Sequence, residues 1–170
     1  MKKAFLPLIL ALTFVACKHV PTAKEATTYN DKLMEIEKKV VHKQEALNET
    51  FGSSEKPASD KATMEKAQKD LLDEAKKAKE EGEKLGAFDG SREFLDGTLK
   101  YIDTHRQLGE NEYGELIKLY SKPVDPSANE ADTDRINKII DAIGKKLDSS
   151  YKEFILSCDK FAEKYKLVRK

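Results

Sequence analysis

The side chains best suited to covalent or metal chemistry in this sequence are two cysteines and three histidines. They are Cys17, Cys158, His19, His42 and His105. No His-x-x-His, His-Glu-x-x-His or Glu-x-x-His spacing joins them, and these are the spacings that hold zinc or paired iron. No Gly-x-Ser-x-Gly turn or glycine-rich phosphate loop occurs either. The sequence therefore predicts no catalytic residue, no metal site and no cofactor, and we expect a protein that is not an enzyme.

Cys17 comes directly after a segment typical of an export signal. Lys2 and Lys3 precede an apolar stretch over residues 4–16. A helix of that stretch would rise about 20 Å, which is too short for a bilayer core of about 30 Å. Residues 1–16 are therefore predicted to be a signal peptide rather than a permanent membrane span.

The end of this segment, Phe14-Val15-Ala16-Cys17, resembles the bacterial lipobox, although Phe14 stands where that pattern prefers leucine. The resemblance implies that Cys17 carries acyl chains such as palmitate. It also implies that residues 17–22 form a tether between this lipid and the folded part of the chain. Because Lys18 follows the cysteine, it further implies a lipid-anchored place in the cell envelope, at the outer membrane of a Gram-negative bacterium. The alternative is an ordinary signal peptide cleaved near residue 16, with the cysteine incidental.

The distribution of charge argues against a nucleic-acid partner. Without residues 1–16 the chain has 29 Lys and Arg against 31 Asp and Glu, a net charge of about −2. The two signs are interleaved along the sequence, whereas phosphate binding requires a concentrated basic face.

Apolar residues recur at helical spacing along four segments, expected at about 22–51, 59–85, 91–122 and 128–166. Thr22-x-x-Glu25 is a capping box at the start of the first. A weak turn is expected in the third, between Gly109 and Gly114, because glycine is a poor helix former. The sequence thus predicts an all-α protein, an antiparallel up-down-up-down four-helix bundle over residues 23–168. The fourth helix, the most hydrophobic, is expected to be the central packing element.

Four residues are candidates for lining a pocket: Tyr101 and His105 on the third helix, and Tyr151 and Phe154 on the fourth. The second helix has an unusually small-sided face, made of Ala67, Ala75, Ala78 and Gly82, which is expected to lie against the aromatic residues Tyr101, Tyr151, Phe154 and Phe161. Small residues opposite large ones are normal in a packed core. The same arrangement could leave a narrow apolar cavity near the weak turn, and haem held between His42 and His105 is another possibility. Cys158 is expected to be buried as a small apolar group.

The part after residue 16 also resembles uncharacterised four-helix-bundle surface lipoproteins of bacteria. The resemblance lies in Tyr29-Asn30-Asp31, in Leu99-Lys100-Tyr101-Ile102 with Asn111-Glu112-Tyr113, and in Phe161-Ala162-Glu163-Lys164-Tyr165. It implies a fold and a location, and it transfers no catalytic residue. We therefore expect a binding or structural module, held to the membrane by the lipid on Cys17 and contacting a protein partner. The alternative is a carrier of an apolar small molecule or haem in the bundle interior.

Overall fold

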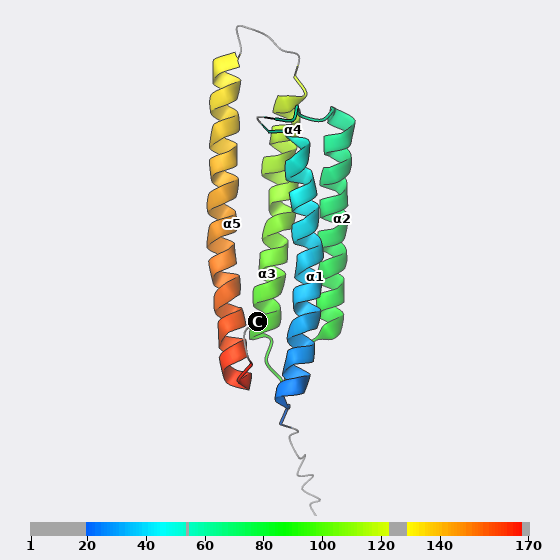
Figure 1. Cartoon of the computed structure of the whole chain (residues 1–170), viewed down its shortest axis with the longest axis vertical. Coiled ribbons are helices and arrows are strands. Elements are labelled where there is room, and N and C mark those ends of the chain that lie inside the picture. The colour runs from blue at the N-terminus through cyan, green and yellow to red at the C-terminus, as the bar shows by residue number, and fades with distance from the viewer. Residues whose placement is uncertain (1–19, 54, 123–128, 168–170) are drawn as a thin grey trace, which may run out of the picture.

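The computed structural model describes residues 20–53, 55–122 and 129–167. They form α1 (Ala23–Thr50), α2 (Lys61–Leu85), α3 (Glu93–Leu108), the π-helical turn η1 (Gly109–Tyr113), α4 (Gly114–Tyr120) and α5 (Asn129–Tyr165). Because α3, η1 and α4 follow one another without a break, four long helical segments pack side by side (Figure 1). The expected all-helical fold with four helices is confirmed in this part of the chain, where each segment begins and ends within two residues of the predicted range.

The start of α1 is fixed by a capping box. The Thr22 hydroxyl accepts a hydrogen bond of 3.2 Å from the Glu25 N–H, and the Thr22 N–H donates to the Glu25 carboxylate at 2.7 Å. Each of the two side chains thereby accepts a hydrogen bond from a backbone N–H that a helix start leaves unpaired. The N-cap Thr22 thus lies five residues after Cys17, which itself lies outside the described residues.

The weak turn predicted in the third helix takes the form of the π-helical turn η1. The carbonyl of Gly109 accepts a hydrogen bond of 2.7 Å from the Gln68 side chain on α2. A methyl group on this glycine would lie 3.0 Å from Leu72 and 3.2 Å from Leu71. Glycine therefore allows α2 to approach the turn, and Gln68 stabilises a carbonyl that a regular helix would have paired internally.

The most tightly packed part of the molecule is the contact of α2 with α1 and α3. Leu33 and Val40 of α1 and Leu71 and Ala78 of α2 have no exposed surface. A methyl group on Gly82 would lie 2.8 Å from Leu99 of α3, so the small residues of α2 bring that helix close to its neighbours. The expectation that these residues face the aromatic side chains of the fourth helix is wrong, because α2 packs against α1 and α3 instead.

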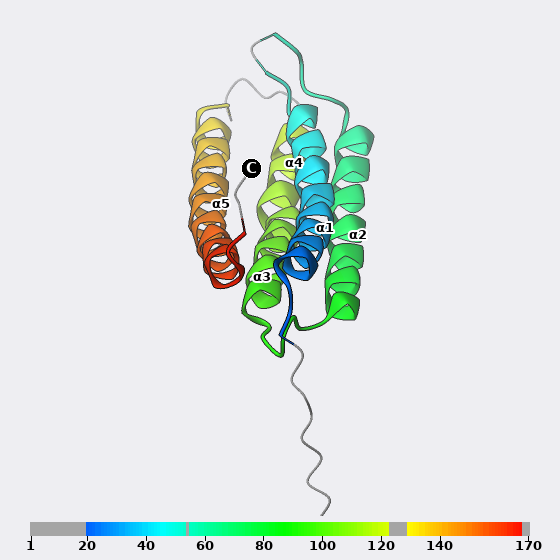
Figure 2. The ribbon, with the colours of Figure 1, turned by 60° about the horizontal axis from the view of Figure 1, so that its bottom comes forward.

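The last helix, α5, lies at the side of the molecule rather than at its centre. It packs along α3, η1 and α4, with little backbone approach to α1, and Figure 2 shows it standing beyond α3 from α1 and α2. Two large apolar side chains of this helix, Ile140 and Tyr151, are 50% and 49% exposed, and Cys158, which was expected to be buried, is only partly buried. The prediction of a central fourth helix is therefore wrong. No helix within the described ranges is long and apolar enough to cross a membrane.

Side chains from different helices meet at both ends of the molecule. At the end where α1 begins, the Tyr29 hydroxyl donates a hydrogen bond of 2.7 Å to the carbonyl of Gly86, just after α2. The Tyr29 ring lies 5.8 Å from that of Phe161, near the end of α5. At the opposite end, Arg135 of α5 donates to Glu115 of α4 at 2.7 Å. These contacts hold α5 at its two ends.

Candidate functional site

A groove of about 570 Å³ runs between α1 and α5. Its lining residues are Thr27, Asn30, Asp31, Met34, Glu37, Tyr151, Phe154, Ile155, Cys158, Asp159, Ala162 and Leu167. Its volume falls within the range of about 300–1,000 Å³ that small-molecule sites occupy. We therefore take this groove as the candidate site.

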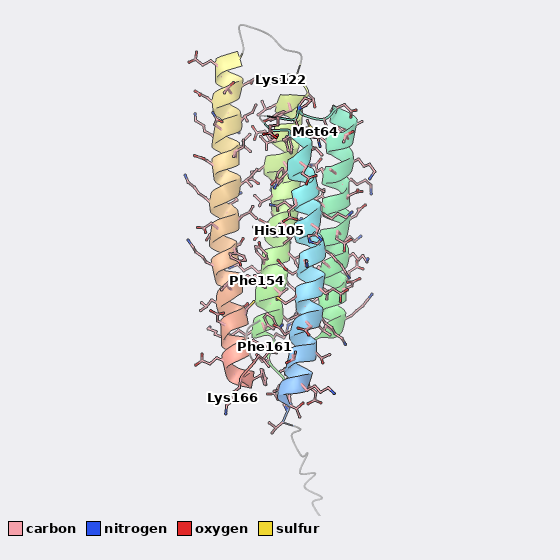
Figure 3. All side chains as sticks on the ribbon, in the orientation of Figure 1. Met64, His105, Lys122, Phe154, Phe161 and Lys166 are labelled. Carbon is pink, nitrogen blue, oxygen red and sulfur yellow. The ribbon has the colours of Figure 1, made fainter. Side chains whose placement is uncertain are left out.

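The groove exists because α5 has two adjacent apolar faces and only one of them is covered by another helix. One face of α5 packs on α3, where Phe154 and Phe161 project from α5 (Figure 3). The adjacent face consists of side chains spaced three or four residues apart: Tyr151, Ile155, Cys158 and Ala162. This spacing places them in one row along the helix. Because α1 does not close over that row, it forms one wall of the groove and α1 forms the other.

The four pocket candidates predicted from sequence lie together in one aromatic cluster. The rings of Tyr101 and Phe154 stack at 4.9 Å, and the imidazole of His105 meets Tyr101 edge-on at 4.5 Å. Tyr151 lies 5.9 Å from Tyr101. Only Tyr151 and Phe154 line the groove. Tyr101 and His105, 7% and 2% exposed, lie behind them, so the cluster is the floor of the groove rather than a separate cavity.

The cavity predicted from sequence near Gly109–Gly114 is not where the groove lies, because the groove is lined by no residue of that turn. The wall that α1 contributes, above all Met34 and Glu37, was not identified from the sequence. The signal for Glu37 was present in the sequence. It follows the buried Leu33 by four residues and precedes the buried Val40 by three, so it borders the apolar stripe of α1.

Glu37 is the most strongly perturbed carboxyl group of the groove. Burial raises its pKa to about 7, and the neighbouring charge of Lys38 opposes the rise. Its side chain makes no hydrogen bond or ion pair with another residue of the described ranges. Burial also raises the pKa of Tyr101 to about 12, with smaller contributions from the charges of Glu37 and Tyr151. A carboxyl group with a strongly raised pKa thus lines the groove, and its charge acts on Tyr101 in the groove floor. A perturbed ionisable group in a cleft makes that cleft a candidate functional site.

His105 belongs to a polar group inside the bundle. Its Nδ1 is hydrogen-bonded to the Gln44 side-chain oxygen, so Nδ1 is the protonated nitrogen. Its buried Nε2 has no hydrogen-bond partner among the described residues. Burial lowers the pKa of His105 to about 4, so the ring is neutral at pH 7. His42 is exposed on another face of α1, and the structure does not bring the two imidazoles to one site.

No group of three or more metal-ligating side chains comes together within residues 20–53, 55–122 and 129–167. The proposed lipid-bearing Cys17 lies just before this part of the chain. The nearest described residue, Val20, is 81% exposed.

Comparisons of the chain with protein-family models, with curated proteins and with solved structures found no match.

Proposed function

We propose that the protein is a lipid-anchored module of the bacterial cell envelope, tethered through Cys17 and acting by binding rather than by catalysis. The signal-like residues 1–16, the lipobox-like residues around Cys17, and Lys18 after it support this reading and favour an outer-membrane location. Acyl chains on the cysteine would supply the anchor, since each buried CH₂ contributes about 0.8 kcal/mol.

The observation that carries the proposal is the distance in sequence between Cys17 and the capped start of α1. The capping box at Thr22 lies five residues after the cysteine in sequence. Five residues reach at most about 18 Å. A lipid on Cys17 would therefore hold the helical domain against the membrane surface, with the end where α1 begins facing the bilayer.

As part of the same proposal, successive helices run antiparallel, up-down-up-down. Three contacts support this arrangement. Tyr29, early in α1, meets Gly86, which follows α2, and Phe161, late in α5. Gln68, early in α2, bonds to Gly109 in the second half of the third segment. The long axis of the bundle would then stand away from the membrane, and the α1–α5 groove would open sideways.

Metabolic labelling with palmitate tests the anchor. Replacing Cys17 with alanine should abolish the label and move the protein out of the membrane fraction or leave it uncleaved. Cys158→Ala is the matched control, because it removes the other cysteine and should retain the full label. Equal labelling of the Cys17→Ala variant and the unaltered chain would refute the anchor.

The volume of the groove favours a second candidate function, a carrier of a small apolar molecule or haem. The ligand would lie in the α1–α5 groove rather than in the bundle interior, where the core is packed. Native mass spectrometry and a visible spectrum of protein from its own host test this candidate. A bound mass or a Soret band supports it, and a clean ligand-free mass without a Soret band dismisses it.

A further inference from the structure

The ionisable side chains that line the α1–α5 groove are all acidic or phenolic, apart from one thiol. Asp31 and Glu37 come from α1 and Asp159, which also interacts with another group, comes from α5. Among residues 20–53, 55–122 and 129–167, no lysine, arginine or histidine lines the groove. The exposed faces of the same helices do not share this bias, since lysines lie beside most of their carboxylates. A cleft lined by one sign of charge concentrates oppositely charged ligands. The groove is therefore electrostatically suited to a cation.

The surroundings of Glu37 favour an organic cation over a metal ion. Its carboxylate interacts electrostatically with Tyr101, and Tyr101 in turn with Tyr151, whose half-exposed ring lines the groove. A metal ion would require several converging oxygen ligands. A carboxylate beside aromatic rings is instead the arrangement that recognises an ammonium group, through charge and through cation–π attraction.

Apolar side chains also line the groove. Its apolar walls are formed by Met34, Phe154, Ile155, Ala162 and Leu167. The flexible thioether of a methionine adapts to ligands of different shape. An occupant would thus place a hydrocarbon or aromatic body along these walls and a positive charge at Glu37.

We propose that the α1–α5 groove binds small organic cations, in which an ammonium group pairs with Glu37 beside Tyr151 and an apolar body lies along Met34 and Ile155. This inference rests on the binding role proposed above and names the class of ligand for it. It does not depend on the lipid at Cys17.

Calorimetric titration of the full chain in non-ionic detergent tests the inference. The probe is benzyltrimethylammonium, which cannot lose its charge, and the comparator is benzenesulfonate, which has the same ring and the opposite charge. We expect saturable binding of one probe per chain and no binding of the sulfonate. Equal binding of both compounds, or binding of neither, would overturn the proposal.

Three variants locate the site. Glu37→Gln keeps the shape of the side chain and should weaken probe binding at least tenfold. Tyr151→Leu keeps apolar bulk without the ring face and should weaken it about threefold to tenfold. The matched control is Glu35→Gln on the same helix, outside the groove, which should change the affinity less than twofold. Unaltered affinity in Glu37→Gln, with an unaltered circular dichroism spectrum, would place the probe elsewhere and refute the site.

Two outcomes separate this inference from competing explanations. Arg169 and Lys170 follow Leu167 in sequence and lie outside the described residues. If the double variant Arg169→Gln, Lys170→Gln binds the probe and the unaltered chain does not, the groove's cationic partner is a residue of this chain. That result would refute the proposal of a separate organic cation. If palmitate labels the chain but the probe does not bind, the groove assignment fails while the anchor stands.

Discussion

The two sides of α1 differ in how they are covered. On the side facing α2 and α3, Leu33 and Val40 are fully buried. On the side facing α5, Met34 and Glu37 border an open groove. The α2 side closes because Ala78 and Gly82 let the helices approach closely. The α5 side stays open because α1 presents polar and charged groups to the remaining apolar row of α5, and burying them without partners would be unfavourable.

This difference indicates that apolar side chains on one helix are not sufficient to close a bundle. The apolar row of α5 that includes Tyr151 and Ile155 faces Asn30, Asp31 and Glu37 across the groove. The lining of the groove therefore combines carboxylates with apolar side chains. It is suited to a ligand that has both an apolar and a cationic part.

The largest expected contrast is between two neighbouring residues of α1. Leu33→Ala should lower the free energy of unfolding by about 2–5 kcal/mol, because it leaves a cavity in the closed side. Met34→Ala should lower it by about 1 kcal/mol or less, because Met34 already borders the groove. Urea denaturation of both variants measures the difference. Equal losses would show that the two sides are equally packed.

A second contrast comes from enlarging small residues. Ala78→Leu adds bulk to a fully buried position and should lower the free energy of unfolding by about 1–3 kcal/mol. Ala162→Leu adds the same bulk in the groove and should change it by less than about 0.5 kcal/mol. Thermal unfolding followed by circular dichroism compares them. A similar loss in both variants would contradict an open groove.

The pH dependence of stability distinguishes Glu37 from His105. Burial raises the pKa of Glu37 from 4.5 to about 7, so the folded state holds this proton more tightly than the unfolded state. The resulting stabilisation is complete below pH 4.5 and is lost as the pH rises to about 7. Glu37→Gln should remove this loss, and at pH 8 it should be more stable than the unaltered chain by about 1–2 kcal/mol, allowing for partial solvent exposure.

The contribution of His105 has the opposite sign. Burial lowers its pKa from 6.5 to about 4, so its stabilisation is complete above pH 6.5 and is lost as the pH falls towards 4. The two effects overlap between pH 4.5 and 6.5 in the unaltered chain. Urea denaturation of Glu37→Gln at a series of pH values separates them, and a pH profile identical to that of the unaltered chain would contradict the burial of Glu37.

Much of this fold follows from local sequence signals. The apolar spacing predicts the four helical segments, Thr22 and Glu25 predict the first cap, and Gly109 with Gly114 predicts an irregular turn. Each of these depends on residues close together in sequence. They are therefore recognisable without knowledge of the tertiary structure.

The candidate site was only partly predictable, because it depends on which helices meet. Tyr101, His105, Tyr151 and Phe154 were identified by residue type, and the structure brings them together. Periodicity could not show that α5 packs on α3 and leaves its second apolar face uncovered. The spacing of Glu37 from Leu33 and Val40 shows that it borders the apolar stripe of α1, but the sequence does not show that this border faces a groove until the neighbouring helix is placed.

The reactivity of Cys158 tests the openness of the α1–α5 side most directly, because this thiol lies in the groove. The comparison is a thiol placed on the closed side by Ala78→Cys, in a chain that also carries Cys158→Ser. Each folded protein is treated with N-ethylmaleimide, and the modified peptide is quantified by mass spectrometry over time. The account predicts that Cys158 reacts at least about 100-fold faster than the closed-side thiol, since the latter requires unfolding to react. Equal rates, or a Cys158 that reacts only in denaturant, would contradict it.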